Sequence, residues 1–186
     1  MNIQDEIYAA RQRVRRDREG ALANLNELFR QGALPDPSLH GRYRGELVTT
    51  SLSRLLDWKA RAFTRIWLPW QGKTFDSNAA TGDNIFSNNG YWLSRLIWPS
   101  YRGVVPDGAG RSRACQFRTF TAAGKLDPDR QVLKIDYDIE ANPGFLLRDV
   151  LDELVQVGEG LYLGKALLRR PEERWICAAY FTLRSE

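Results

Sequence analysis

The C-terminal segment constrains the fold more than any other part of the chain. Two apolar runs, residues 160–169 and 174–184, flank the short sequence Pro-Glu-Glu, and this pattern predicts a β-hairpin. Alternation along the second run places Trp175, Cys177, Ala179 and Phe181 on one face and Ile176, Ala178 and Tyr180 on the other. Both faces are apolar. A strand buried on both sides fits a closed or strongly curved sheet that is covered outside by helices and filled or lined inside.

The rest of the chain contains further strand and helix patterns. Four more strands are predicted, at residues 41–50, 70–76, 112–121 and 131–139. Three helices are predicted, at residues 3–31, 51–67 and 142–157. Gly32 and Pro69 end the first two, and the third begins after a plausible N-cap, Asn142, and ends at Gly158.

This order of elements favours the α+β class over a parallel α/β sheet, because the helices come before and between strands that end in hairpins. We predict a single domain over residues 1–186, with an N-terminal helix in 1–32 and a body in 41–186. The body is expected to be a small antiparallel β-barrel or a strongly curved sheet, with the two later helices inserted.

Composition excludes several classes of protein. Hydrophobic residues make up 43% and charged residues 27%, as in an ordinary globular protein. The formal charge is only +4, and acidic residues balance most of the arginines in the first helix, which argues against a nucleic-acid partner. The chain begins with charged residues, and no stretch approaches the ~20 apolar residues of a membrane span. We therefore expect a cytoplasmic protein without a membrane span.

The residue types available for chemistry are limited. The chain has two cysteines, Cys115 and Cys177, and one histidine, His40, without the spacing of a metal site. Its glycine-rich stretches lack the strand-to-helix setting of a phosphate-binding loop. We expect no metal and no cofactor. The remaining candidates are carboxylates, lysines, tyrosines and backbone groups.

Charged residues interrupt three otherwise apolar strands. Lys73 and Lys165 each follow a glycine, which in a strand often marks a bulge or a close approach to the backbone. Asp136 and Asp138 share one face of their strand, while Tyr137 lies on the other. Two alternatives remain open. The carboxylates point into the barrel and meet the lysines, or they face solvent and the lysines lie at strand ends.

An aromatic group lies within the Gly/Asn-rich segment 77–110. Such a long connection is more often a functional lid or rim than an idle linker. Tyr91 and Trp92 could form the rim of a pocket or pack in a flap.

Two strands resemble a known pattern. The sequences GRYRG at 41–45 and WQGKTFD at 70–76, with a predicted helix between them, resemble a poorly characterised bacterial domain family. That family has a Gly-x-Trp-x-Gly strand followed by a Trp-x-Gly-Lys-x-Phe strand, although Tyr43 here replaces the first tryptophan. It is similar to the lipocalin-like (calycin-type) barrels. The resemblance implies such a barrel around a small apolar ligand.

Three functions remain open. The first is binding of a small hydrophobic or aromatic molecule in the barrel, and its predicted contacts are Trp70, Lys73, Tyr91, Trp92, Asp136, Tyr162 and Lys165. The second is a cofactor-independent isomerase, cyclase or dehydratase, with catalytic candidates Asp136, Asp138, Lys73 and Tyr137. The third is an interaction subunit that docks on a protein partner through the N-terminal helix, whose first half, residues 3–16, lacks a wide apolar stripe and is expected to project from the body.

Overall fold

The computed structural model describes residues 2–36, 38–51, 70–87 and 98–186. Two α-helices come first: α1 (Ile3–Arg13) and α2 (Arg18–Gln31). The strands that follow are β1 (Gly41–Thr50), β2 (Trp70–Asp76), β3 (Thr81–Ser87), β4 (Val105–Pro106), β5 (Arg111–Ala123), β6 (Gln131–Asp136), β7 (Val150–Gly158), β8 (Leu161–Arg169) and β9 (Trp175–Ser185). Short 3-10 turns, η1 (Leu147–Asp149) and η2 (Pro171–Glu173), precede β7 and β9.

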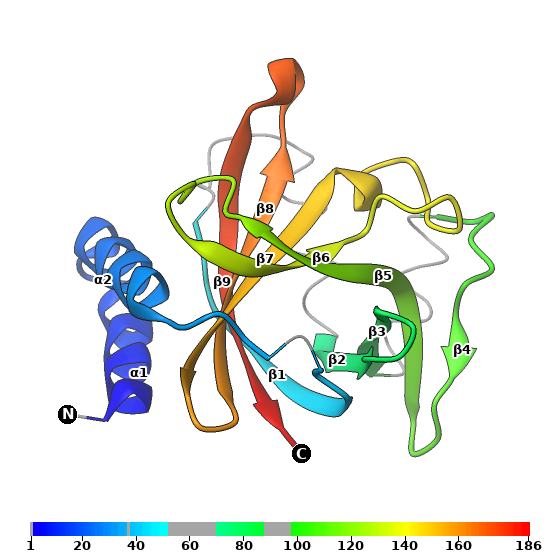
Figure 1. Cartoon of the computed structure of the whole chain (residues 1–186), viewed down its shortest axis with the longest axis horizontal. Helices are drawn as coiled ribbons and strands as arrows, with labels where there is room; N and C mark the ends of the chain where they lie inside the picture. Colours follow the sequence, from blue (N-terminus) through cyan, green and yellow to red (C-terminus); the bar gives the residue numbers. More distant parts are fainter. Residues whose placement is uncertain (1, 37, 52–69, 88–97) are drawn as a thin grey trace.

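The strands close into an antiparallel barrel (Figure 1). Within the described residues the sheet runs in the order β3-β2-β1-β9-β8-β7-β6-β5-β4, and a further β3–β5 pairing joins its ends. Eight strands form the ring, and β4 lies on the edge of β5 outside it. The predicted α+β fold with a lipocalin-like barrel is confirmed.

The N-terminal region forms two helices rather than the single predicted one. The chain breaks before Asp17, whose side chain accepts a hydrogen bond from the Gly20 N–H and caps α2. Helix α2 buries Ala21, Leu25, Leu28 and Phe29, which are spaced on one helical face. Both helices lie on one side of the barrel (Figure 1), with α1 against β1 and α2 against β7. The expectation that the first helix projects from the body is therefore wrong.

The helix predicted at 142–157 is also wrong, because most of this segment is strand β7. Its first six residues are all buried, since one face lines the barrel and the other lies under α2. A strand covered on both sides has no polar face, so its apolar residues also match a helical stripe. The glycine turn after Val157 belongs to a β7–β8 hairpin, which the helix prediction overlooked.

The other predicted strands are confirmed, although the one predicted at 131–139 ends at Asp136, and β3 and β4 are additions from the segment 77–110. A bulge at the β8–β9 pairing shifts the register near Ala178. Cys177 therefore packs outside the barrel and Phe181 inside, although simple alternation had placed them on one face. The helix predicted at 51–67 and the aromatic pair Tyr91 and Trp92 lie outside the described residues.

Candidate functional site

The interior of the barrel is lined with aromatic rings that lie against glycines of the wall. A methyl group on Gly45 would meet the Trp70 ring, one on Gly164 would meet Phe181, and one on Gly82 would meet Phe117. The missing side chains therefore leave room for these rings on the inner surface. Phe181 and Phe117 are completely buried, and the Trp70 side chain is nearly so.

Lys73 enters this aromatic interior because β2 contains a bulge. Trp70 and Lys73 are three residues apart, so a regular strand would place them on opposite faces. The register with β3 shifts by one residue between Trp70 and Gly72, which puts both side chains on the inner face. Gly72 has φ +148°, and a Cβ there would lie 2.0 Å from the Tyr43 carbonyl oxygen. This is the close approach that the glycine before Lys73 predicted.

Four side chains from separate parts of the barrel form a buried polar cluster, which we call the inner cluster: Lys73, Asn84, Tyr137 and Asp152. The Lys73 ammonium lies 2.9 Å from Asp152 Oδ2 and donates to Asn84 Oδ1 at 2.8 Å and to the Tyr137 hydroxyl. Tyr137 in turn donates to Asp152 Oδ2 at 3.0 Å, and Trp70 Nε1 donates to Asn84 Oδ1 at 3.0 Å.

Aromatic rings surround the ammonium of Lys73. It lies 5.6 Å from the ring centroid of Trp70, 5.2 Å from Phe117, 5.1 Å from Tyr137 and 5.5 Å from Phe181. Rings at these distances attract a cation through their quadrupoles, and the attraction is greater where water is excluded. The inner cluster is therefore an ion pair inside an aromatic box.

A strained residue holds the Asn84 side chain in place. Cys115 lies at a bulge in β5 and has φ +55°, a left-handed conformation that is uncommon for a residue with a side chain. Its carbonyl accepts from Asn84 Nδ2 at 3.1 Å, and its N–H donates to the Tyr101 hydroxyl at 2.8 Å. Strained backbone of this kind persists where the surroundings impose it, often beside functional groups.

Burial changes the proton affinities within the inner cluster. It raises the pKa of the Asp152 carboxyl, and the Lys73 ammonium only partly opposes this. It also lowers the pKa of Lys73, opposed by Asp152, and raises the pKa of Tyr137 well above its ordinary value. The proton affinities of the carboxylate and the amine thus approach each other. In addition, Asp152 Oδ1 has no hydrogen-bond partner within the part of the chain that the structure describes.

The predicted site residues divide into three groups. Trp70, Lys73 and Tyr137 belong to the inner cluster or its rings, and Tyr162 also lines the barrel, with its ring 5.7 Å from that of Tyr43. Tyr91 and Trp92 cannot be assigned, since they lie outside the described residues. The others, Lys165, Asp136 and Asp138, lie outside the barrel.

Lys165 is buried beneath α2, where it donates to Asn26 Oδ1 at 2.6 Å and to Asp127 Oδ2 at 2.5 Å. Asp136 pairs with Arg118 at 2.7 Å, and Asp138 with Arg148 at 2.6 Å. The hypothesis that the carboxylates enter the barrel and meet both lysines is therefore wrong. The apolar face of β6 points inward instead, since Leu133, Ile135 and Tyr137 pack in the core inside the barrel.

The similarity of this chain to a protein of known structure concerns its fold. No protein-family model and no curated protein sequence matches the chain. A protein from Thermomonospora curvata with a known crystal structure matches over 96% of this chain and 99% of its own. The TM-score is 0.50 and the sequence identity 14%, so the likeness shows the fold alone.

Three further properties of the described residues concern metal binding, membrane spans and the cysteines. No group of three or more histidine, cysteine, aspartate or glutamate side chains there could hold a metal ion. None of the helices in the same residues is long and apolar enough to span a membrane. Both Cys115 and Cys177 are free thiols.

Sequence reasoning missed Asp152 and Asn84. Asp152 lies in the segment that was predicted to be a helix and is in fact strand β7. The β-branched Val150, Val155 and Val157, followed by a glycine turn, were the available signal for a strand. Asn84 lies in β3, within a segment whose glycines and asparagines hid its alternation.

Proposed function

We propose that this chain is a cytoplasmic binding protein that holds a small, largely apolar or aromatic molecule inside its barrel. The inner cluster fixes the orientation of that molecule. The ligand's apolar body contacts the rings around Lys73. A hydroxyl or N–H group of the ligand donates to Oδ1 of Asp152, which lacks a hydrogen-bond partner among the described residues.

The observation that carries this proposal is the position of the inner cluster. Lys73 and Asp152 are both fully buried at the centre of an aromatic interior, and their partners within the described residues are other groups of that interior. Taking two charges out of water costs several kcal/mol per ion. The barrel is already closed by its backbone pairing, so topology alone does not require this pair.

The dimensions and composition of the barrel support the same function. Eight-stranded barrels are either filled by their own side chains or hold one small ligand, so a barrel of this size is compatible with ligand binding. Pockets for such molecules are mostly apolar, with a few convergent polar groups that set orientation. The inner cluster and its rings match this description.

The family resemblance is consistent with this function. Of the motif Trp-x-Gly-Lys-x-Phe, Trp70, Lys73 and Phe75 line the interior, and Gly72 forms the bulge that turns Lys73 inward. On this basis we propose that the chain is a distant relative of the Gly-x-Trp-x-Gly domain family.

A probe-binding experiment tests the proposal. N-phenyl-1-naphthylamine is small and aromatic and has one N–H donor, and its binding can be followed by quenching of tryptophan emission. We expect about one saturable site. The K73M/D152L variant, which keeps side-chain volume but removes the inner polar groups, should weaken binding about tenfold or more.

The matched control is K134M/E153L. Glu153 follows Asp152 directly and pairs with Lys134 on the opposite face of the same wall. This variant should bind the probe like the native protein. Native affinity in a folded K73M/D152L variant, or equal losses in both variants, would contradict the proposal.

A second function, proton transfer on the bound molecule, is favoured by the direct contact between Asp152 and Lys73, where burial raises the pKa of the carboxyl and lowers the pKa of the amine. A carboxyl and an amine whose proton affinities are shifted towards each other, and which both contact the Tyr137 hydroxyl, can supply a base and an acid without a cofactor. Native mass spectrometry of protein purified from its own host would identify a retained ligand. Incubating that ligand with the protein in D₂O should then introduce deuterium at carbon, and K73M/D152L should abolish the uptake. Uptake that persists in the variant would exclude this function.

A further inference from the structure

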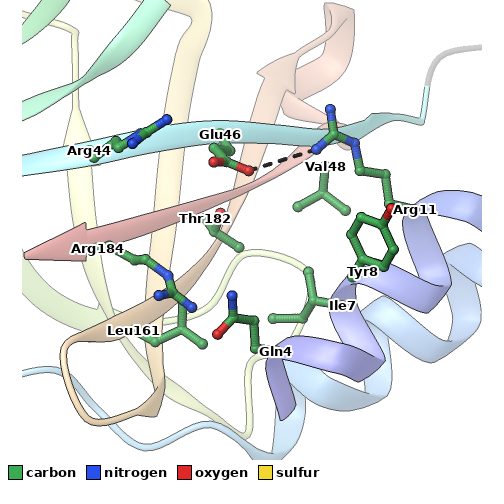
Figure 2. Close-up of a pocket in the computed structure, with 10 residues that line it drawn as sticks. All are labelled: Gln4, Ile7, Tyr8, Arg11, Arg44, Glu46, Val48, Leu161, Thr182 and Arg184. Atoms are coloured by element: carbon green, nitrogen blue, oxygen red, sulfur yellow. Dashed lines mark ion pairs between the residues drawn. The ribbon is translucent and has the colours of Figure 1, made fainter. Parts of the chain in front are cut away.

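A cleft lies outside the barrel, between α1 and the sheet (Figure 2). Its volume is about 250 Å³. The lining residues come from α1 and from strands β1, β8 and β9: Gln4, Ile7, Tyr8, Arg11, Arg44, Glu46, Val48, Leu161, Thr182 and Arg184. The residues of the inner cluster are absent from this lining, so the cleft is separate from the proposed ligand site.

The base of the cleft is apolar. Ile7 from the helix and Val48 and Leu161 from the sheet are buried beneath it, with exposed fractions of 6%, 7% and 7%. Tyr8 stands beside it with 61% of its surface exposed, an unusual exposure for an aromatic ring with an apolar body. The cleft therefore offers apolar contact area next to solvent.

The polar side of the cleft carries an uncompensated positive charge. Arg44 on β1 and Arg184 on β9 are direct cross-strand partners. Like charges directly opposite each other on one face of a sheet are destabilising. Neither guanidinium has an ion-pair partner within the described residues, whereas Arg11 lies 3.7 Å from Glu46. Three arginines and one glutamate leave a charge of about +2 around the cleft.

We propose that this cleft binds a small amphiphile with an oxyanion head group, a carboxylate or a phosphate monoester. The head group binds between Arg44 and Arg184 and relieves their repulsion, because guanidinium groups present paired N–H donors that match such oxygens. A short apolar chain lies over Ile7, Val48 and Leu161. The cleft, at about 250 Å³, is slightly smaller than the usual range for small-molecule sites, so the ligand is short.

Calorimetric titration of the full chain with three compounds tests this assignment. Octanoate and octyl phosphate carry the two head groups on the same chain, and octanol carries no charge. We expect saturable binding of at least one anion and none of octanol at the same concentration. The tighter of the two anions identifies the head group.

Two arginine variants locate the site. R184Q and R44Q should each weaken anion binding about tenfold or more, since each removes charge-assisted hydrogen bonds. R174Q is the matched control. Arg174 is an exposed arginine that immediately precedes β9, at the end of that strand opposite to Arg184. It should bind like the native protein. R184Q should also be at least as thermally stable as the native chain, because it removes a like-charge pair.

Three outcomes would overturn the proposal. If octanol binds as tightly as the anions, the two arginines do not contribute to the affinity. Inorganic phosphate binding as tightly as octyl phosphate would remove the role of the apolar base. Equal losses in R184Q and R174Q would indicate attraction to net charge rather than a site.

Discussion

Two buried ionic clusters lie on opposite sides of the barrel wall, and they differ in what they connect. The outer cluster consists of Lys165 and Asp127, with Asn26 and Arg30 of α2, next to the Lys134–Glu153 pair. It joins α2, the turn between β5 and β6, and the strands beneath. The inner cluster joins groups of the barrel interior only.

The two clusters differ in the elements that they connect, and not in whether all their polar atoms have hydrogen-bond partners. Glu153 Oε2 in the outer pair lacks a hydrogen-bond partner within the described residues, as does Asp152 Oδ1 inside. The outer ions, however, connect α2 and the β5–β6 turn to the wall. The inner ions attach no additional element. The outer ion pairs have a structural explanation, because they connect a helix and a turn to the barrel. The inner ion pair connects no such element, so we look for a functional explanation.

The largest expected effect is at Asp152. D152L leaves the Lys73 ammonium buried without its carboxylate, and breaking such a pair typically costs ~3–5 kcal/mol. Urea denaturation followed by tryptophan fluorescence measures this loss. The K73M/D152L variant should recover most of it, because a volume-matched apolar pair needs no solvation. A double variant as unstable as D152L would mean that the inner pair is structural after all.

A smaller effect is expected in the outer cluster. K165M removes the hydrogen bonds to Asp127 and Asn26, but Asp127 keeps its 2.9 Å contact with Arg30. The carboxylate is therefore not left alone, and we expect a cost of ~1.5–3 kcal/mol. Hydrogen exchange should show the loss concentrated in α2. Increased exchange spread over the whole barrel would argue against a docking role.

The interior should also determine how the protein responds to alkaline pH. Burial raises the pKa of the Cys115 thiol from 9.0 to about 12. The folded thiol thus keeps its proton after the unfolded one has lost it. The contribution to stability is fully present below pH 9 and is lost as the pH rises towards 12. At pH 10 the loss should be about 1.4 kcal/mol. Urea denaturation at pH 8 and pH 10 measures it, and in C115A the difference should shrink by that amount.

The smallest effect is expected at the surface pair. Arg118 is largely exposed, so D136N should cost less than ~1 kcal/mol. It should also leave binding of N-phenyl-1-naphthylamine unchanged, because Asp136 faces away from the barrel interior. A loss of probe binding in D136N would mean that Asp136 contributes to the ligand site. The inner and outer sides of the wall would then not differ in function as proposed.

Several parts of the fold and the site could be predicted from the sequence. The apolar faces of the last hairpin indicated a closed sheet, and the glycine before Lys73 indicated a bulge. Trp70, Lys73 and Tyr137 were named as site residues, and all three lie in the interior. These inferences succeeded because alternation, glycine and turn residues act within a few neighbouring positions.

Only the tertiary structure decided which face of each strand turned inward and which charges met. Lys73 and Lys165 have similar sequence surroundings, yet one lies inside the barrel and the other beneath α2. Asp152 and Glu153 are neighbours on opposite faces of β7, and a strand covered on both sides has no sequence signal that distinguishes its interior from its exterior. The side that faces inward is set by bulges and by the register between distant strands. Those follow from packing the whole barrel at once, which no local pattern encodes.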